Sequence, residues 1–184
     1  MALFLSSCLQ SEYTKLVKSE LAKGIRKDSI LFGIKFGDTR NDFYGKCFDL
    51  NKQQLVTQGP SNSSVQYLFT DSIVHQVPTE LRMLFYPSFD AQDKISEMNL
   101  EFSYMAWAPW NEKYQSDSLK IKVLDLLMRW YDGNGFVVAN VNDTTHMPVK
   151  VDANRRMLVY TIDKQNVIVK IQDILNPRFK HSIN

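Results

Sequence analysis

A five-residue segment that occurs twice constrains the fold of this chain more than any other feature. Residues 82–86 read RMLFY and residues 156–160 read RMLVY, 74 positions later (156 − 82 = 74). Each copy follows a predicted helix and strand, and each precedes a turn and an alternating strand. Two units of one helix and three antiparallel strands bury more apolar surface together than apart. The repeat therefore predicts an α+β fold: two tandem helix-plus-three-strand units that form one antiparallel sheet, with the helices packed on one face.

The first unit is predicted over residues 29–108. Apolar side chains alternate over residues 29–36, which predicts a strand with one buried face. Thr39, with Asp42 three residues later, forms a variant capping box, so we expect a helix from there to about Lys52. Further strands are predicted at 65–69, 81–89 and 95–107.

The second unit is predicted over residues 109–184. Asp117 or Ser118 can cap a helix that runs to about Asp132 and stops at the sequence Gly-Asn-Gly. A separate amphipathic helix is predicted in the N-terminal segment, residues 9–28, because its apolar residues fall close to one face. The strands of the second unit are predicted at 136–141, 155–162 and 167–174.

The composition argues against several classes of protein. The chain has 184 residues, of which 44% are hydrophobic, enough for a packed core. Its 22 basic and 20 acidic residues give a net charge of +2, without the basic clustering of a nucleic-acid interface. The sequence has no apolar run of about 18 residues, so no membrane-spanning helix is expected. It also has no phosphate-binding loop, nucleophile elbow or Cys-x-x-Cys pair, so we expect no cofactor and no metal.

Two sets of titratable residues could carry chemistry. His75 and His146 each follow an aspartate and precede a proline, and we interpret them as polar loop residues rather than metal ligands or acid–base groups. Glu97 and Glu101 lie on the polar face of the alternating strand over residues 95–107, a face that we expect to be open to solvent. A hydrolase that uses these two carboxylates is the alternative function, and it requires a cleft around them.

An aromatic cluster lies where the two predicted units meet. Trp107 falls on the polar side of the strand, and Trp110 and Tyr114 lie in the connector that follows. Exposed aromatic side chains are typical of sites that bind proteins or sugars. Alternatively, the three side chains cover the joint between the units, since large aromatic residues are usually buried. They are the candidate binding residues, and both interpretations stay open.

The N-terminus carries a short motif around a cysteine. Residues 5–8 read LSSC and resemble the lipobox of bacterial lipoproteins, in which a signal peptidase cleaves before the cysteine and a lipid is attached to its sulfur. The resemblance implies that residues 1–8 are a signal remnant and that Cys8 carries the lipid. A signal peptide needs more than the seven residues before Cys8, so the start would lie upstream or the chain would be shortened. The alternative is an apolar N-terminus with a free thiol.

The sequence around the first helix resembles a known family. In FGIKFGDTRNDFYGKCFDL, Gly37 and Thr39 open the helix and Phe43 is its first apolar residue, similar to the entry of the SmpA/OmlA (BamE-like) lipoprotein domain. The second unit has Ser116-Asp117-Ser118 in place of this Gly-x-Thr entry. Two such units in tandem resemble the beta-lactamase-inhibitor-protein-like fold. The resemblance implies a non-catalytic, lipid-anchored protein of the bacterial cell envelope, periplasmic or outer-membrane-anchored. Such a protein touches the membrane only through its lipid and acts by contact with an envelope protein or glycan.

Overall fold

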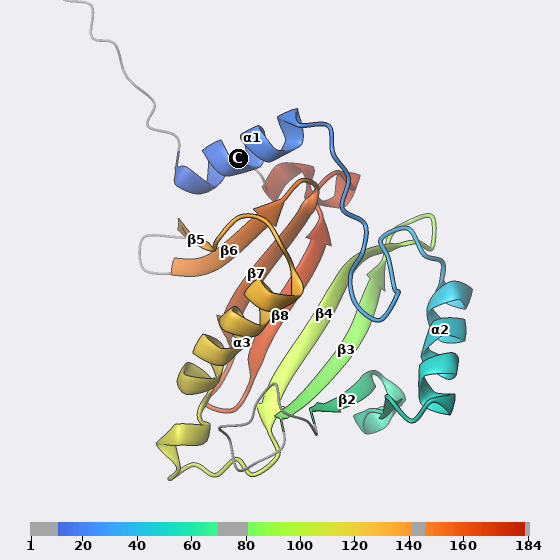
Figure 1. Ribbon diagram of the computed structural model, residues 1–184, viewed down its shortest axis with the longest axis vertical. Coiled ribbons are helices and arrows are strands. Elements are labelled where there is room, and N and C mark those ends of the chain that lie inside the picture. The colour runs from blue at the N-terminus through green and yellow to red at the C-terminus, as the bar shows by residue number, and fades with distance from the viewer. Residues whose placement is uncertain (1–10, 70–80, 141–145, 183–184) are drawn as a thin grey trace, which may run out of the picture.

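The computed structural model describes residues 11–69, 81–140 and 146–182. They form an α+β fold in which three α-helices pack against one eight-stranded antiparallel sheet, so the predicted α+β class with an antiparallel sheet is confirmed (Figure 1). The strands are β1 (Thr57–Gln58), β2 (Val65–Phe69), β3 (Leu81–Phe89), β4 (Ile95–Tyr104), β5 (Val137–Asn140), β6 (His146–Asp152), β7 (Arg155–Thr161) and β8 (Val167–Asp173). Their order across the sheet is β1-β2-β3-β4-β8-β7-β6-β5.

The two copies of the repeated segment lie on β3 and β7. Arg82 faces Ser103 on β4, and its Nε donates a hydrogen bond of 3.2 Å to the Ser103 hydroxyl. Arg156 faces Gln172 on β8, and its Nε donates one of 2.9 Å to Gln172 Oε1. In both copies the arginine therefore binds the side chain directly opposite on the next strand. The methionine that follows each arginine points to the other face and is fully buried.

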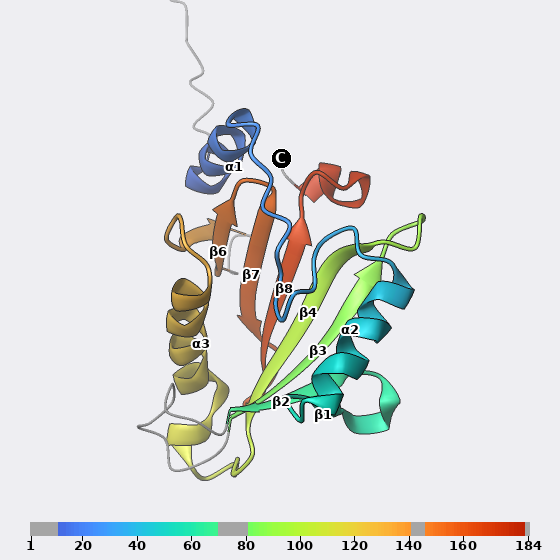
Figure 2. The ribbon, with the colours of Figure 1, turned by 45° about the vertical axis from the view of Figure 1, so that its right-hand side comes forward.

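Helices α2 (Arg40–Lys52) and α3 (Ser116–Trp130) cover the sheet face that carries these methionines (Figure 2). The predicted capping box starts α2, because Thr39 and Asp42 each accept a hydrogen bond from the other's backbone N–H. Phe43 is the buried residue that α2 adds to the core. The buried apolar residues of α3 are Leu119, Val123, Leu126 and Leu127.

Helix α1 (Glu12–Ala22) packs on the opposite face, so the prediction that the helices share one face is wrong for this helix. Val17 belongs to a small second core with Val149 and Val151 of β6. These valines point away from α2 and α3, because side chains alternate between the two faces of a strand. The apolar stripe of α1 therefore covers sheet surface near the β5–β6 edge that the other two helices cannot reach.

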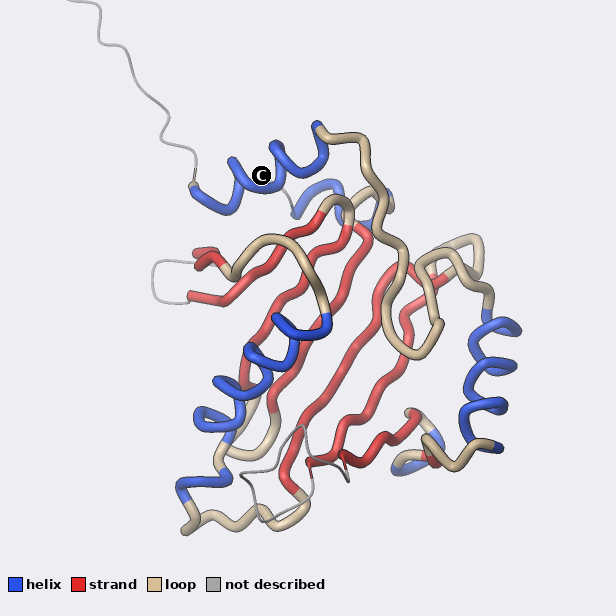
Figure 3. Tube along the Cα trace, viewed as in Figure 1, coloured by secondary structure: helices blue, strands red, loops and turns tan. Residues whose placement is uncertain are grey.

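The segment over residues 29–36 is an irregular loop, so its prediction as a strand is wrong. A single bridge between Ser29 and Lys35 is the pairing that the described residues give it. Phe32 and Gly33 have φ values of 49° and 76° and reverse the chain. The loop lies over the sheet between α2 and α3 (Figure 3). Apolar side chains of this loop point down onto the sheet and fill the core. They therefore alternate with polar residues along the sequence, as the side chains of a strand in the sheet would.

Strands β1 and β6 were not predicted. His146 opens β6 instead of lying in a loop, and its Nδ1 lies 2.8 Å from Asn140 Oδ1. Strand β6 was missed because it contains Pro148, and a proline argues against the assignment of a strand inside a sheet. It is tolerated here because β6 pairs with β7 only from Val149 onward.

The polar face of β4 is buried, contrary to the prediction that it is open to solvent. Glu97 is 3% exposed and Asn99 is 6% exposed. Gln172 Nε2 donates to Glu97 Oε2 (2.5 Å), and Gln172 Oε1 accepts from Arg156, so three strands share one polar network. β4 lies in the middle of the sheet, where long side chains of β3 and β8 flank it on both sides. Even polar side chains at this position therefore lose contact with water.

Candidate binding site: an aromatic pocket

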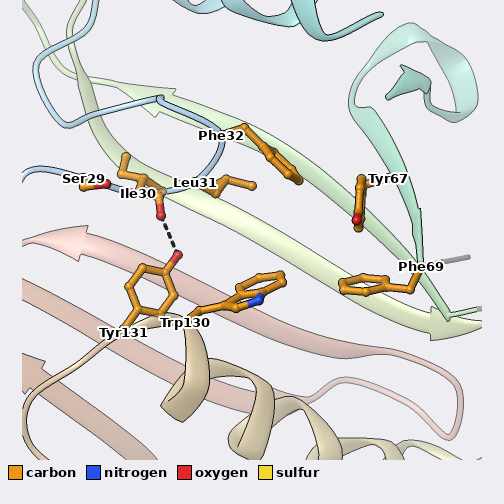
Figure 4. A pocket seen from close by; sticks show the side chains of 8 residues that line it. All are labelled: Ser29, Ile30, Leu31, Phe32, Tyr67, Phe69, Trp130 and Tyr131. Atoms are coloured by element: carbon orange, nitrogen blue, oxygen red, sulfur yellow. Dashed lines mark hydrogen bonds between the residues drawn. The ribbon is translucent and has the colours of Figure 1, made fainter. Parts of the chain in front are cut away.

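An aromatic pocket of about 350 Å³ lies where the 28–37 loop passes the C-terminal end of α3 and strand β2 (Figure 4). Three segments that are distant in sequence build it. This volume is near the lower end of the range of about 300–1,000 Å³ for ligand pockets, so it suits one ring or one large apolar side chain. The lining residues are Ser29, Ile30, Leu31, Phe32, Tyr67, Phe69, Trp130 and Tyr131.

Four aromatic side chains form a continuous wall in this pocket. The ring centroids of Phe32 and Tyr67 are 5.1 Å apart, and those of Tyr67 and Phe69 are 4.8 Å apart in an edge-to-face pair. Phe69 in turn lies nearly parallel to Trp130, at 6.0 Å and 13°. Aromatic pairs at such distances contribute about 0.5–1.5 kcal/mol each beyond their buried area. The wall is therefore held in one arrangement by its own contacts.

Two buried residues fix the loop that borders the pocket. The Tyr131 hydroxyl donates to the carbonyl oxygen of Ile30 (2.7 Å), and Arg155 Nη1 donates to that of Ser29 (2.9 Å). The guanidinium of Arg155 also stacks on the Tyr131 ring, 4.5 Å from its centroid. Burial raises the pKa of Tyr131 well above its usual value, so the hydroxyl keeps its proton and remains a donor. The pocket is preformed, and a ligand does not have to order it.

Phe32 adopts a backbone conformation that is rare for a bulky side chain. Its φ of 49° lies in the left-handed region, which costs about 1–3 kcal/mol for a residue other than glycine. Two hydrogen bonds hold the turn: Lys46 Nζ donates to the Gly33 carbonyl (2.9 Å), and the Ile34 N–H donates to the Leu31 carbonyl (2.8 Å). The strained turn places the Phe32 ring against Tyr67, where it completes the wall.

A buried ionic cluster lies behind Arg155. Lys150 Nζ lies 3.0 Å from Asp152 Oδ2, and Arg155 Nη2 lies 3.8 Å from the same oxygen. Asp152 Oδ1 accepts a hydrogen bond of 2.8 Å from the backbone N–H of Asn134. The preceding Gly133 has a φ of 120°, and a Cβ there would meet Asp152 Oδ1 at 2.1 Å, so the site requires glycine. One carboxylate thus balances two buried cations.

The lining of the pocket supports binding rather than acid–base chemistry. Among the described residues that line it, the titratable side chains are tyrosines, and none is a carboxylate, histidine, lysine or arginine. An enzyme site needs titratable groups that converge on a concave surface. Within residues 11–69, 81–140 and 146–182, no group of three His, Cys, Asp or Glu residues is placed to hold a metal ion.

The candidate residues from the sequence lie outside this pocket. Trp107 is half-buried, and its indole N–H donates to the Lys164 carbonyl in the β7–β8 turn (3.1 Å). Tyr114 is half-buried, with its ring 5.2 Å from that of the buried Tyr104. Trp110 is 84% exposed. Two of the three therefore pack against neighbouring elements, and Trp110 presents its side chain to solvent.

The two carboxylates of the alternative function do not share a site. Glu97 and Glu101 are four residues apart on one strand, which separates their Cα atoms by about 13 Å. Both oxygens of Glu97 are already occupied, one by Gln172 and one by the Ser88 hydroxyl. This geometry disfavours hydrolysis by the pair.

The remaining residues that bear on chemistry are two cysteines and a histidine. Cys8, the expected site of lipid attachment, and His75 lie outside the described residues. Cys47 is half-buried in α2, and burial raises the pKa of its thiol to about 11. Its thiol therefore stays protonated and unreactive at neutral pH.

Comparisons of the chain with protein-family models, with curated proteins and with solved structures found no match. Of the helices that the structure describes, none is long and apolar enough to span a membrane. The function must therefore be inferred from the residues of the chain and their geometry.

Proposed function

We propose that this chain is a non-catalytic binding protein that acts by contact, and that its aromatic pocket receives an apolar side chain of a protein partner. The observation that carries the proposal is a preformed pocket to which the described residues contribute five aromatic rings and no charged side chain. Apolar anchors that fill such desolvated pockets supply most of the binding energy of protein interfaces. A charged group would lose its hydration in this pocket without gaining a partner, so an apolar group is favoured.

The pocket can be tested through Trp130. The chain has three tryptophans, so replacing Trp107 and Trp110 by Phe leaves Trp130 as the single reporter. We expect nitrobenzene, a neutral probe with a single ring, to bind saturably and quench its fluorescence. Phe32→Ala should weaken this binding about tenfold, because the lost ring contact is worth about 1–1.5 kcal/mol. Phe48→Ala, which removes a 60% exposed ring of α2 outside the pocket, is the matched control and should change nothing. No binding, or equal binding by both variants, would contradict the proposal.

Contact with a protein is tested in cells by site-specific photocrosslinking. A photoreactive amino acid at position 67, on the wall of the pocket, should join the chain to a partner, whereas one at position 48 should not. Phe32→Ala should reduce the crosslink from position 67. Crosslinks from position 48 only would place the contact on the outer side of α2.

We also propose that a lipid on Cys8 anchors the protein in the bacterial cell envelope. The support is the LSSC motif and its resemblance to the lipobox. Mass spectrometry of the membrane fraction should find a diacylglycerol group on Cys8, and Cys8→Ser should move the protein to the soluble fraction. Cys47→Ser is the control and should leave the protein in the membrane fraction, since this thiol is half-buried in α2. A full-length protein with an unmodified Cys8 would refute the anchor.

The architecture that we propose is a tandem of two BamE-like units, which divide the sheet between β4 and β8. In β3 and β7 the repeat makes Phe85 equivalent to Val159, and these residues pair with Leu100 and Val169. Leu100 and Val169 in turn pair with each other at the centre of the sheet. If a twofold axis relates the two units, equivalent residues must face each other where β4 pairs with β8. The strand order, β1 to β4 from one edge and β5 to β8 from the other, supports the same relation.

A further inference from the structure

We propose that a second pocket, between α2 and the edge of the sheet at β2 and β3, binds the ring of a neutral saccharide. Its volume is about 260 Å³, which suits one ring rather than a larger ligand. α2, the chain that leads into β2, and the end of β3 line it, and no residue lines both pockets. This site does not depend on the function proposed for the aromatic pocket.

The second pocket combines an apolar floor with a polar rim. Phe43 and Phe85 underlie the pocket and are 4% and 0% exposed, so Tyr44 offers the more accessible aromatic surface. Tyr44 lies on α2 with 56% of its surface exposed, so its ring is accessible for stacking. Asn62 and Ser63 add an amide and a hydroxyl to the same lining. A saccharide matches both parts, because its C–H faces pack on aromatic rings and its hydroxyls exchange hydrogen bonds with amide and hydroxyl groups.

The loop that carries the polar rim is strained. Ser61 and Asn62 are consecutive residues other than glycine with φ values of 55° and 57°. Next to them, the side chain of Ser64 packs so closely on Gly59 that a Cβ there would meet Ser64 Oγ at 2.3 Å. Strained backbone persists where the surroundings enforce it, and it is concentrated at ligand sites. Here it brings the Asn62 side chain to the pocket.

The charges at the second pocket argue against an anionic ligand. Of the described residues that line it, only Arg40 is charged, and Arg40 Nη2 is paired with Asp93 Oδ1 at 2.8 Å. The N-terminal amides of α2 could attract an anion, but the side chains of Thr39 and Asp42 already cap this end. The positive charge is therefore balanced. None of the described residues that line the pocket is a carboxylate, so the role proposed for it is to hold a saccharide rather than to hydrolyse one.

The strand edge beside the pocket argues against a peptide ligand. β3 pairs with β2 only as far as Phe85, so residues 86–89 form an open edge on that side. Pro87 lies in this stretch and has no N–H, and a proline on an edge strand turns its nitrogen to the unpaired side. A peptide strand that paired with this edge would lack one backbone N–H donor, at Pro87, in the middle of its row of hydrogen bonds. A saccharide needs no continuous ladder.

The test is saturation-transfer NMR with glucose, galactose, mannose and N-acetylglucosamine as probes, combined with chemical-shift mapping on the labelled protein. We expect at least one of these sugars to bind with a millimolar dissociation constant and to shift the signals of residues 40–44 and 62–65. Tyr44→Ala should weaken binding about three- to tenfold, because the stacking ring is lost. Asn62→Gly, which keeps the positive φ and removes the amide, should weaken it by a similar factor.

Phe48→Ala is the control, because Phe48 is 60% exposed one turn further along α2 and does not line the pocket. It should bind sugar as the parent protein does, and circular dichroism should show the same fold for all variants. The proposal is overturned if none of the four sugars binds, if the shifted signals lie elsewhere, or if both pocket variants bind normally. It is also overturned if inorganic phosphate or an extended peptide binds at these residues more tightly than the sugars.

Discussion

Replacing Asp152 by Asn should lower the free energy of unfolding by about 3–5 kcal/mol, because two buried cations lose their counter-charge. Lys150 is 0% exposed and Arg155 is 5% exposed, and both approach Asp152 Oδ2. Removing the one carboxylate leaves the two buried cations without a paired counter-charge, although Lys150 keeps its hydrogen bond to the Asn134 carbonyl and Arg155 keeps its hydrogen bond to the Ser29 carbonyl. Chemical unfolding followed by circular dichroism measures the loss.

The matched control is Asp93→Asn, which breaks the exposed ion pair with Arg40. The Asp93 side chain is 57% exposed, so this variant should lose less than about 1 kcal/mol. Asp152→Asn should also weaken probe binding in the aromatic pocket, because Arg155 holds the Ser29 carbonyl at its rim. Equal losses in the two variants would mean that the buried charges are solvated and that the cluster does not anchor the loop.

Glu20→Gln should remove a pH-dependent contribution to stability of about 3 kcal/mol. Burial by itself raises the pKa of Glu20, but hydrogen bonds from the Lys23 side chain, the Ala153 N–H and the Asn134 amide outweigh it. Together they lower the pKa from 4.5 to about 2. At about 1.4 kcal/mol for each pKa unit, this difference corresponds to about 3 kcal/mol. The ionised carboxylate therefore holds α1 to the β6–β7 turn.

The sign of the pH dependence follows from the lowered pKa. The folded state binds the proton of Glu20 less readily than the unfolded state, so the contribution is fully present above about pH 4.5. It is lost as the pH falls from 4.5 towards 2. Urea unfolding over this range should show the difference between the parent protein and Glu20→Gln shrinking towards zero. Glu12→Gln, in the exposed first turn of the same helix, should show a small difference. A large difference for Glu20→Gln that persists at pH 2 would contradict this account.

The fold was more predictable from the sequence than the site was. Two features with a local signal were predicted correctly: the Thr39–Asp42 capping box starts α2, and both copies of the repeated segment form strands. The predicted cap of α3 at Asp117 or Ser118 was wrong, because the helix begins at Ser116 after Gln115. The aromatic pocket has no local signal, because Phe32, Tyr67 and Trp130 come from three segments. Gly33 within the apparent strand was the one hint of the turn, since an isolated glycine in a strand pattern suggests an irregularity.

The sequence by itself determined the three helices and six of the eight strands, because capping and the period of apolar residues act between neighbours in the chain. Only the tertiary structure decided what those elements contact. Side-chain period cannot distinguish a strand in the sheet from a loop packed on it, so residues 29–36 were misassigned. Side-chain period also cannot show whether the polar face of a strand is exposed to solvent. β4 lies at the centre of the sheet, and Glu97 on its polar face is buried. Burial depends on what lies next to a residue in space, and that is fixed only when all eight strands and three helices come together.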